Sequence, residues 1–392
     1  MEVTNSCKFF GQCGGCRYLD ISYADELALK RAALLEVFGE FSGLVDEIIP
    51  AIKPMEYRNK MELAFGDEGR DGRLALGMRK QRSFYEVATP MDCVLICADF
   101  KKIILYVLQY FRESGETFYH RKRHTGALRH LVLRRGEATG EMLVLLSTAS
   151  SLQTPLEPMI EGLQDLKLDG KIVGILHSVN DGVADAVKAD DVRLLWGRDF
   201  YFDELVIGAV TPLRFKISMF SFFQTNTKGA EVLYSVVKEA AGMGKHALDL
   251  YCGTGTITQI ISPLFEQVTG VEIVDAAIAV AKKNAELNGI KNCNFIAGDA
   301  TKVLSELTAK DSPKKRLDLI IVDPPRDGLS PKALSYVTSF CAKKIIYVAC
   351  KPKSLARDLP QLISAGYTPQ KITPVDMFPR TPHIECVCLL AK

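Results

Sequence analysis

The stretch IIYVACKPKSLAR, residues 345–357, joins a predicted strand to a predicted helix through a cysteine. The β-branched residues before Cys350 predict a buried strand, and Pro352 suits the first turn of a helix, where its missing N–H costs nothing. We therefore expect Cys350 at the edge of a sheet, beside the positive end of a helix, which lowers the pKa of a thiol. A single cysteine is more often a buried structural residue, so the rest of the chain must decide its role.

Strands and helices alternate from Leu233 onward. Helices are predicted from Thr256 and over 275–288, and the predicted strands cover residues 247–251, 267–272, 294–296, 317–322, 344–349 and 386–390. Repeated strand–helix units of this kind predict a mainly parallel sheet that binds ligands at the carboxyl ends of its strands. We therefore predict an α/β, Rossmann-like catalytic domain over residues 221–392.

The preceding residues have a different texture, and a chain of 392 residues is long enough for more than one domain. Residues 1–44 hold three cysteines and a predicted helix that ends at Gly39 after Phe38. Residues 45–220 contain short apolar runs bounded by Gly, Asp and Arg, at 61–65, 131–133, 142–146, 172–177 and 194–196. These runs predict a β-rich central domain between the cysteine segment and the catalytic domain.

The composition indicates the cellular compartment and the class of protein. The chain is 47% hydrophobic and 24% charged, as in soluble globular proteins. No apolar run approaches the roughly 20 residues of a membrane span, and residues 1–8 lack a signal-peptide core. We expect a cytoplasmic protein without a membrane partner, in which eleven cysteines indicate metal binding or catalysis rather than disulfides.

The net charge of +2 neither favours nor excludes a nucleic-acid partner, but the cations are unevenly distributed. Residues 121–135 contain no acid and carry eight basic or histidine side chains, namely Arg121, Lys122, Arg123, His124, Arg129, His130, Arg134 and Arg135. A solvated face and a phosphate-binding surface explain such a block about equally well.

Three cysteines open the chain in the pattern C-x5-C-G-G-C, at Cys7, Cys13 and Cys16. In a reducing compartment this spacing favours a metal or iron–sulfur site. A fourth ligand is required, and Cys93 and Cys97 are the two candidates nearest in sequence. Spacing alone does not separate zinc from a cluster, but the C-x3-C-x2-C pattern of radical enzymes is absent.

A cofactor site is predicted where the segment DLYCGTGT, residues 249–256, turns from a strand into a helix through two glycines. Glu272 ends the next predicted strand, where a carboxylate can accept hydrogen bonds from ribose, and Asp299 follows the third, near an adenine. The third glycine of a nicotinamide site is missing. These features favour S-adenosylmethionine over a dinucleotide. The segment DPPR, residues 323–326, is typical of enzymes that methylate nucleic-acid bases, although prolines also favour an ordinary turn.

A protein thiol is needed for one kind of methyl transfer in particular. C5 of a pyrimidine is a poor nucleophile until a thiolate adds to C6, and a base must afterwards remove the C5 proton. Cys350 has the placement for that nucleophile. For the base we favour Glu385, with His383 as the alternative, because both precede the last predicted strand.

Taken together, these segments resemble the RNA uridine C5-methyltransferases, the family of 23S rRNA and tRNA 5-methyluridine enzymes. The resemblance spans nearly the whole chain, through C-x5-C-G-G-C, YRNKME (57–62), LRH (128–130), SFFQTN (221–226), DLYCGTG, DPPR, Cys350 with Pro352 and LARD (355–358), and MFP (377–379) with HIE (383–385). It implies a class I S-adenosylmethionine-dependent methyltransferase domain behind an iron–sulfur segment.

The resemblance also implies residue roles. A [4Fe-4S] cluster would be held by Cys7, Cys13, Cys16 and Cys93, and the nucleophile and the base would be Cys350 and Glu385. The cofactor contacts would come from Gln224, Tyr251, Thr256, Glu272, Asp299 and Asp323.

Three departures from the family pattern matter. Lys351 stands where the family usually has asparagine, and its charge is expected to lower the thiol pKa further. Many cluster-bearing relatives begin with a β-barrel TRAM domain, for which six residues before Cys7 leave no room, so RNA recognition is expected from the central domain and the 121–135 block. Cys386 and Cys388 add thiols beside the proposed base.

The predicted function is methylation of C5 of a specific RNA uridine by a monomeric enzyme. We expect the target in 23S rRNA, because cluster-bearing relatives often act there. The T-loop of tRNA is the alternative. Phe222 or Phe223 would stack on the extruded base. Cytosine enzymes normally carry a second cysteine after the proline of the DPPR-like motif, where this chain has Arg326. A rival from another class is an iron–sulfur RNA-binding protein with a silent methyltransferase domain.

Overall fold

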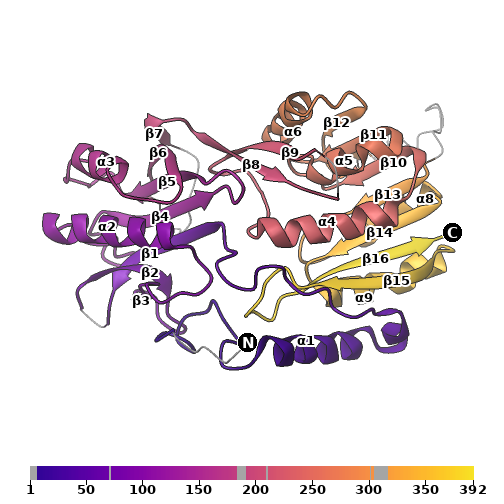
Figure 1. Cartoon of the computed structure of the whole chain (residues 1–392), viewed down its shortest axis with the longest axis horizontal. Helices are drawn as coiled ribbons and strands as arrows, with labels where there is room; N and C mark the ends of the chain where they lie inside the picture. The colour runs from indigo at the N-terminus through magenta and orange to yellow at the C-terminus, as the bar shows by residue number, and fades with distance from the viewer. Residues whose placement is uncertain (1–6, 70–71, 183–190, 209–210, 301, 304–316) are drawn as a thin grey trace.

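The computed structural model describes residues 7–69, 72–182, 191–208, 211–300, 302–303 and 317–392. Two seven-stranded sheets lie side by side, one built from the first half of the chain and one from the second (Figure 1). None of the helices in these residues is long and apolar enough to cross a membrane. The expected boundaries at 44/45 and 220/221 stay a prediction.

The catalytic sheet has the strand order β12-β11-β10-β13-β14-β16-β15. Its strands are β10 (Gly244–Leu250), β11 (Phe265–Glu272), β12 (Cys293–Ala297), β13 (Leu319–Val322), β14 (Lys344–Ala349), β15 (Thr368–Val375) and β16 (Glu385–Ala391). Strands β10 to β14 pair in parallel, whereas β16 runs antiparallel to both β14 and β15. The α/β prediction for this half of the chain is therefore confirmed.

Helices cover both faces of the catalytic sheet, as the continuous apolar strands require. The helices are α4 (Thr227–Ala241), α5 (Thr256–Ile261), α6 (Asp275–Leu287), α8 (Pro331–Ser339) and α9 (Pro352–Ser364), with a 3-10 turn η2 (Ser262–Leu264). Strand β14 shows the two-sided burial: Ile346 and Val348 enter the core beneath α4 and α5, while Ile345 and Tyr347 enter the core beneath α8 and α9. Pro352 occupies the first turn of α9, as the sequence predicts.

The central sheet has the order β3-β2-β1-β4-β5-β6-β7. Its strands are β1 (Lys60–Asp67), β2 (Leu74–Arg79), β3 (Val87–Ala88), β4 (Leu128–Arg135), β5 (Glu141–Thr148), β6 (Lys171–Val179) and β7 (Val192–Gly197). All five predicted apolar runs lie in these strands. The β-rich prediction missed two helices, α2 (Ala98–Ser114) and α3 (Glu157–Gln164), which pack on one face of the sheet. Helix α2 is amphipathic, with Ile103, Val107 and Phe111 buried along one face.

A shared core joins the two sheets. The hairpin β8 (Phe200–Leu205) and β9 (Leu213–Ser218) packs with α4, with the other face of the central sheet and with the catalytic sheet. Val132 and Leu143 of the central sheet therefore lie in the same apolar cluster as Leu319 and Ile346 of the catalytic sheet.

The N-terminal helix α1 (Tyr23–Phe38) packs against the catalytic half of the molecule (Figure 1). Ser22 caps its first turn, and a 3-10 turn η1 (Gly39–Leu44) follows. The chain then lies beside β15, where Val45 bridges to Ile372 and Ile49 to Val375.

A buried charge network fixes α1 to the loop before β16. The ammonium of Lys30 lies 2.8 Å from a carboxylate oxygen of Glu26 and 2.8 Å from one of Asp376, and all three side chains are buried. The backbone N–H of Arg380 donates to Glu26 at 2.7 Å, and the hydroxyl of Tyr23 donates to Asp376 at 2.8 Å. Because every charge has a partner, the network tolerates burial.

Replacing Lys30 with methionine should lower the free energy of unfolding by about 3 kcal/mol, because it leaves the buried carboxylate of Asp376 without a cation and that of Glu26 with Arg380 alone, at 3.5 Å. The free energy is measured by denaturant titration. Lys53→Met is the matched control, since Lys53 pairs with Glu137 in a partly exposed position, where an ion pair contributes under about 1 kcal/mol. Equal stability of the two variants would contradict the expectation.

Candidate functional site

Four neighbouring strands bring the predicted catalytic residues to one edge of the catalytic sheet. Strands β10, β13 and β14 end there, and the antiparallel β16 begins there. Ala349 pairs with Cys386 in the antiparallel register, so Cys350 and Glu385 are the next residues outward on the two adjacent strands. Asp323 follows the last residue of β13 on the neighbouring strand.

Negative charge is concentrated around Cys350. Burial and the neighbouring Asp323 raise the pKa of Glu385 to about 8, while the guanidinium of Arg326 opposes the shift. Burial raises the pKa of Asp323 to about 7. Burial and the carboxylates of Glu385 and Asp323 also raise the pKa of the Cys350 thiol, and Arg326 again opposes the change. The expectation that the helix end and Lys351 lower this pKa is therefore wrong for the free protein, because burial among acids dominates.

A second buried carboxyl lies beneath the glycine turn. Asp249, at the end of β10, is fully buried, and burial together with Asp323 raises its pKa to about 7. Its Oδ2 accepts a hydrogen bond from Thr258 at 2.6 Å, whereas its Oδ1 has no hydrogen-bond partner among the described residues. An unsatisfied buried oxygen of this kind fits a site that a ligand's donor completes.

The glycine turn combines backbone strain with a tight approach. Tyr251 has a left-handed φ of 64°, which is rare for an aromatic residue. Gly255 has φ 76° and caps α5, and a Cβ there would lie 2.6 Å from the ring of Phe295. Only glycine fits that position, since both the conformation and the space exclude a side chain.

Glu272 and Asp299 lie beside this turn, as the sequence predicts. The two carboxylate oxygens of Glu272 accept hydrogen bonds from the backbone N–H groups of Gly253 (3.1 Å) and Val274 (3.0 Å). Burial is the main cause of the raised pKa of the Tyr251 phenol. Both carboxylates lie close enough to raise that pKa further. Thr256 is the first residue of α5 and is buried.

Gln224 reaches the same edge from the segment before α4. Its side chain is hydrogen bonded to the phenol of Tyr234, which is buried near Asp323 and Glu385. Its backbone carbonyl accepts a hydrogen bond from the amide of Asn59 at 3.0 Å.

Three sequence motifs lock together around Gln224. Asn226 caps α4 and donates from its side chain to the carbonyl of Met377 at 2.8 Å. The hydroxyl of Tyr57 donates to the carbonyl of Pro379 at 2.9 Å. The YRN, FFQTN and MFP segments, distant in sequence, thus form one hydrogen-bonded unit in front of β16. Their separation in the sequence explains why no local pattern shows this contact.

The structure also places the residues that the sequence left ambiguous. Phe223 is buried in the core, whereas 69% of the Phe222 side chain is exposed. Cys386 and Cys388 are fully buried in apolar core, and burial raises the pKa of both thiols. Neither of these thiols is a rival to Cys350 for reaction with a substrate. His383 is exposed, in contrast to the buried Glu385.

Sequence reasoning gave no role to Arg326 or Arg58. Partial desolvation of the His383 ring lowers its pKa, and both guanidinium groups oppose its protonation and lower the pKa further. Arg326 also favours the anionic forms of Cys350 and Glu385. The position of Arg326 within DPPR could have indicated this role, since a cation beside an acid at a strand end can lower the pKa of a neighbouring thiol.

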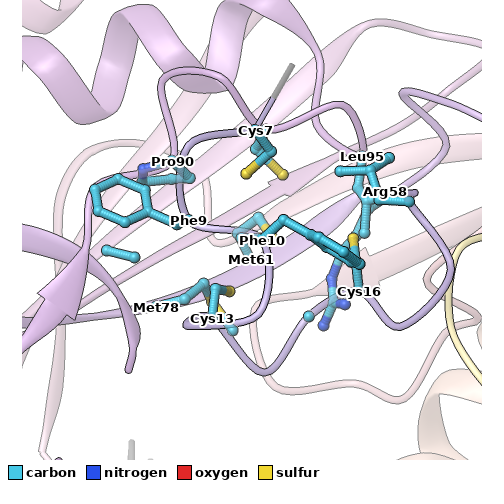
Figure 2. Close-up of a pocket in the computed structure, with 14 residues that line it drawn as sticks. Cys7, Phe9, Phe10, Cys13, Cys16, Arg58, Met61, Met78, Pro90 and Leu95 are labelled. Atoms are coloured by element: carbon cyan, nitrogen blue, oxygen red, sulfur yellow. The ribbon is translucent and has the colours of Figure 1, made fainter. Parts of the chain in front are cut away.

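The four cysteines of the expected cluster line one cavity. Figure 2 shows Cys7, Cys13 and Cys16 on different sides of this cavity, among apolar side chains. Cys93 completes the lining, and burial with repulsion from Cys93 and the other two thiols raises the pKa of Cys16 to about 12. Cys97 does not line the cavity but precedes the first turn of α2.

No site for a single metal ion is found in the described ranges. Within them, no group of three or more histidine, cysteine, aspartate or glutamate side chains is arranged to hold an ion. The four thiols surround a space instead of meeting at one point.

The basic block divides into two parts. Arg129, His130 and Arg134 are buried. Arg134 donates to the backbone carbonyls of Ser218, Met219 and Ser221, so it holds the turn that leads to the FFQTN segment. As a whole, the block is therefore not a phosphate-binding surface, and only its first residues, 121–124, lie in a surface turn.

Comparison with known proteins shows the family of the chain. A model of the tRNA (Uracil-5-)-methyltransferase family matches residues 176–392. An uncharacterized RNA methyltransferase of Clostridium tetani is 42% identical over 100% of this chain and 84% of its own length. A similar protein of Caldanaerobacter subterraneus is also 42% identical, over 100% of this chain and 85% of its own. The chain belongs to this family.

A solved relative supports the fold of this S-adenosylmethionine-dependent RNA methyltransferase. The tRNA (uracil-54, C5)-methyltransferase of Pyrococcus abyssi, solved in complex with S-adenosyl-L-homocysteine, matches with a TM-score of 0.77 and 27% identity. The match covers 97% of this chain and 86% of that one. The predicted enzyme class and the methyltransferase fold are therefore confirmed.

The electrostatics predict how Cys350 reacts in this RNA methyltransferase. Below pH 8 or so, Glu385 is mainly neutral, so Glu385→Gln should leave the rate of iodoacetamide addition to Cys350 unchanged. Above that pH, the carboxylate of Glu385 opposes thiolate formation, so the variant should react faster than the wild type. The rate is measured by peptide mass spectrometry at Cys350, with the exposed Glu286→Gln as control. Superimposable pH profiles at all pH values would show that the two groups are not coupled.

Proposed function

We propose that this chain methylates C5 of a specific RNA uridine with S-adenosylmethionine, through a covalent bond between Cys350 and C6 of the base. The observation that carries the proposal is the register of β14 and β16, which puts Cys350 next to the buried Glu385 at the ligand-binding edge of the sheet. A nucleophile and a base that act on the two ends of one C5–C6 bond must lie this close together.

Cys350 acts first, in its thiolate form. The sulfur forms a bond to C6, and the C5–C6 π electrons move toward O4 to give an enolate. Arg326, which favours the anionic forms of both Cys350 and Glu385, assists at this step. S-adenosylmethionine, when bound, would supply a methyl group on a positively charged sulfur. C5 of the enolate would take up that group as the S–CH3 bond breaks, and the donor sulfur would leave as a neutral thioether.

Glu385 completes the reaction. C5 now bears both a methyl group and a proton, and the Glu385 carboxylate removes the proton. The electrons of the C5–H bond restore the C5–C6 double bond, and the C6–S bond breaks to regenerate the thiolate. The raised pKa of Glu385 matches a base that must take a proton from carbon and then release it to water. His383 is less suited to act as the base, because its side chain is exposed and would not shield the covalent adduct from water.

The cofactor site that we propose comprises Gln224, Tyr251, Thr256, Glu272, Asp299 and Asp323. Glu272 lies at the glycine turn, where its remaining lone pairs can accept from ribose, and Asp299 lies at the end of the next strand. The unpartnered oxygen of Asp249 and the half-buried Asp323 give this edge a negative character that suits a sulfonium cation.

We propose 23S rRNA as the acceptor. Phe222, the exposed first residue of the FFQTN motif, would stack on the uracil once the base has left its helix. The T-loop of tRNA is the second candidate, because the solved relative from Pyrococcus abyssi acts on uracil-54 of tRNA.

Two variants test the chemistry. Cys350→Ala should abolish methylation and keep S-adenosylmethionine binding, since the thiol contributes only the covalent step. Glu385→Gln should accumulate a protein–RNA adduct that survives denaturing electrophoresis, because the C5 proton stays in place. Measurable turnover by the alanine variant would overturn the nucleophile, and a glutamine variant with full activity would move the base to His383 or water.

The acceptor is decided by mapping 5-methyluridine in RNA from cells with and without the gene. Loss of a single site in 23S rRNA, restored by the wild type but not by Cys350→Ala, is the expected result. Loss of the T-loop modification would select tRNA. If neither RNA changes and no adduct forms with 5-fluorouridine RNA, the chain is an RNA-binding protein whose methyltransferase domain is silent.

We further propose that Cys7, Cys13, Cys16 and Cys93 hold a [4Fe-4S] cluster. Four thiols around a cavity lined by apolar side chains fit the ligand set and the burial of such a cluster, whereas zinc would draw them to one point. Methyl transfer needs no electron, so the role of the cluster is to shape the segment between the central sheet and the catalytic edge.

Iron and acid-labile sulfide in anaerobically purified protein test this assignment. Cys93→Ser should lose both, whereas Cys97→Ser, a matched change outside the cavity, should retain them. Zinc without sulfide in the wild type would replace the cluster by a single ion. Equal iron loss in both serine variants would remove Cys93 from the ligand set.

A further inference from the structure

The hairpin surface, which we define as the β2–β3 turn (residues 79–87) together with residues 117–124, forms one continuous patch on the central sheet. Tyr85 of the hairpin stacks on His120 with ring centroids 4.3 Å apart and an interplanar angle of 23°. Phe118 lies against the same tyrosine, with centroids 5.8 Å apart. These contacts join two segments that are thirty residues apart in sequence into one rigid surface.

The patch is basic and carries an exposed aromatic side chain. Arg82, Lys122 and Arg123 are exposed, and none of them forms an ion pair within the described ranges. Phe84 is 73% exposed, the most of any phenylalanine in the described part of the chain. The carboxylate of Glu86 is paired with Lys80 at 3.2 Å and does not neutralise the three exposed cations.

Packing does not account for these side chains. Because Phe84 is mostly exposed, it contributes little hydrophobic free energy to folding. Cations around an exposed aromatic ring fit single-stranded nucleic acid, in which phosphates bind to cations and bases stack on rings. A duplex would leave Phe84 without a base, because its bases are already stacked.

A chain of backbone contacts connects the hairpin surface to the catalytic edge. The N–H of Gln81 donates to the carbonyl of Gln12 at 2.7 Å, and Lys80 forms a bridge with Cys13. At the other end of the cysteine segment, the N–H of Arg17 donates to the carbonyl of Arg380 at 2.7 Å, in the loop before Glu385. The hairpin surface and the loop before Glu385 therefore contact the two ends of the same cysteine segment.

We propose that the hairpin surface binds an unpaired stretch of the RNA substrate outside the methylated loop, with Phe84 stacked on a base and Arg82, Lys122 and Arg123 on phosphates. This inference rests on the proposed function, since it assumes an RNA substrate. The central sheet would then select the RNA substrate, because the catalytic edge contacts only the one flipped base.

The test compares two variants that each lose three charges. Arg82→Ala/Lys122→Ala/Arg123→Ala removes the cations of the hairpin surface, and Lys282→Ala/Lys283→Ala/Lys291→Ala removes three exposed lysines around α6 and β12. Binding to unmodified 23S rRNA and unmodified tRNA from cells lacking the gene is measured by filter binding over a range of salt concentrations. S-adenosylmethionine binding reports whether each variant is folded.

The hairpin variant should reduce the slope of log K against log salt by about 2, as three lost contacts to single-stranded phosphates require. Phe84→Ala should weaken binding by about tenfold with little change in that slope. The control should retain wild-type binding, and kcat at saturating RNA should be unchanged in every variant.

Two outcomes would overturn the inference. Wild-type affinity in the hairpin variant and in Phe84→Ala would show that the surface does not contact the RNA, and equal weakening in the control would show nonspecific charge attraction. In both cases the wild type still methylates RNA, so the proposed function stands. If the wild type neither binds nor methylates either RNA, the proposed function fails and this inference fails with it.

Discussion

The catalytic edge depends on the antiparallel pairing of β16 with β14. In a purely parallel sheet, the amino end of every strand lies at the edge opposite the ligands. Because β16 runs the other way, its first residue, Glu385, lies at the same edge as Cys350, which follows the last residue of β14. The sheet thus brings the proposed base, at the start of one strand, against the proposed nucleophile, at the end of its neighbour.

Burial then sets the protonation of this edge. Asp249, Asp323 and Glu385 lie close together with little solvent, and each has a raised pKa because ionisation is costly there and adjacent acids repel. A site of this kind holds a proton until a cation arrives. The sulfonium of the proposed donor is such a cation, so binding of the donor and ionisation of the acids would favour one another.

The supports of the site come from distant parts of the chain. The Lys30 network attaches α1 to the loop before β16, and the amide of Asn59 and the hydroxyl of Tyr57 attach the central half to the FFQTN and MFP segments. The cysteine segment lies between these supports and touches the same loop through Arg17. Any change in the packing of the cysteine segment would therefore reach the loop that precedes Glu385.

The sequence by itself determined six of the seven strands of the catalytic sheet and the starts of α5, α6 and α9, because apolar runs, glycine turns and the proline of α9 are local signals. It did not show β15, α4 or α8. It also placed the candidate residues at strand ends, since each motif carries its own boundary. It did not reveal helices α2 and α3 in the central half, where short apolar runs dominated the pattern, nor that Arg134 is buried against three carbonyls.

Only the tertiary structure decided the direction of the Cys350 pKa, because burial raises it first and the acids that raise it further, Glu385 and Asp323, lie on or directly after other strands. It also decided which second-half cysteines are core residues and which of Cys93 and Cys97 faces the cavity of the cysteine segment. Local sequence fixes what a residue can do through its own backbone. Its charge state and its partners depend on segments that approach only when the chain folds.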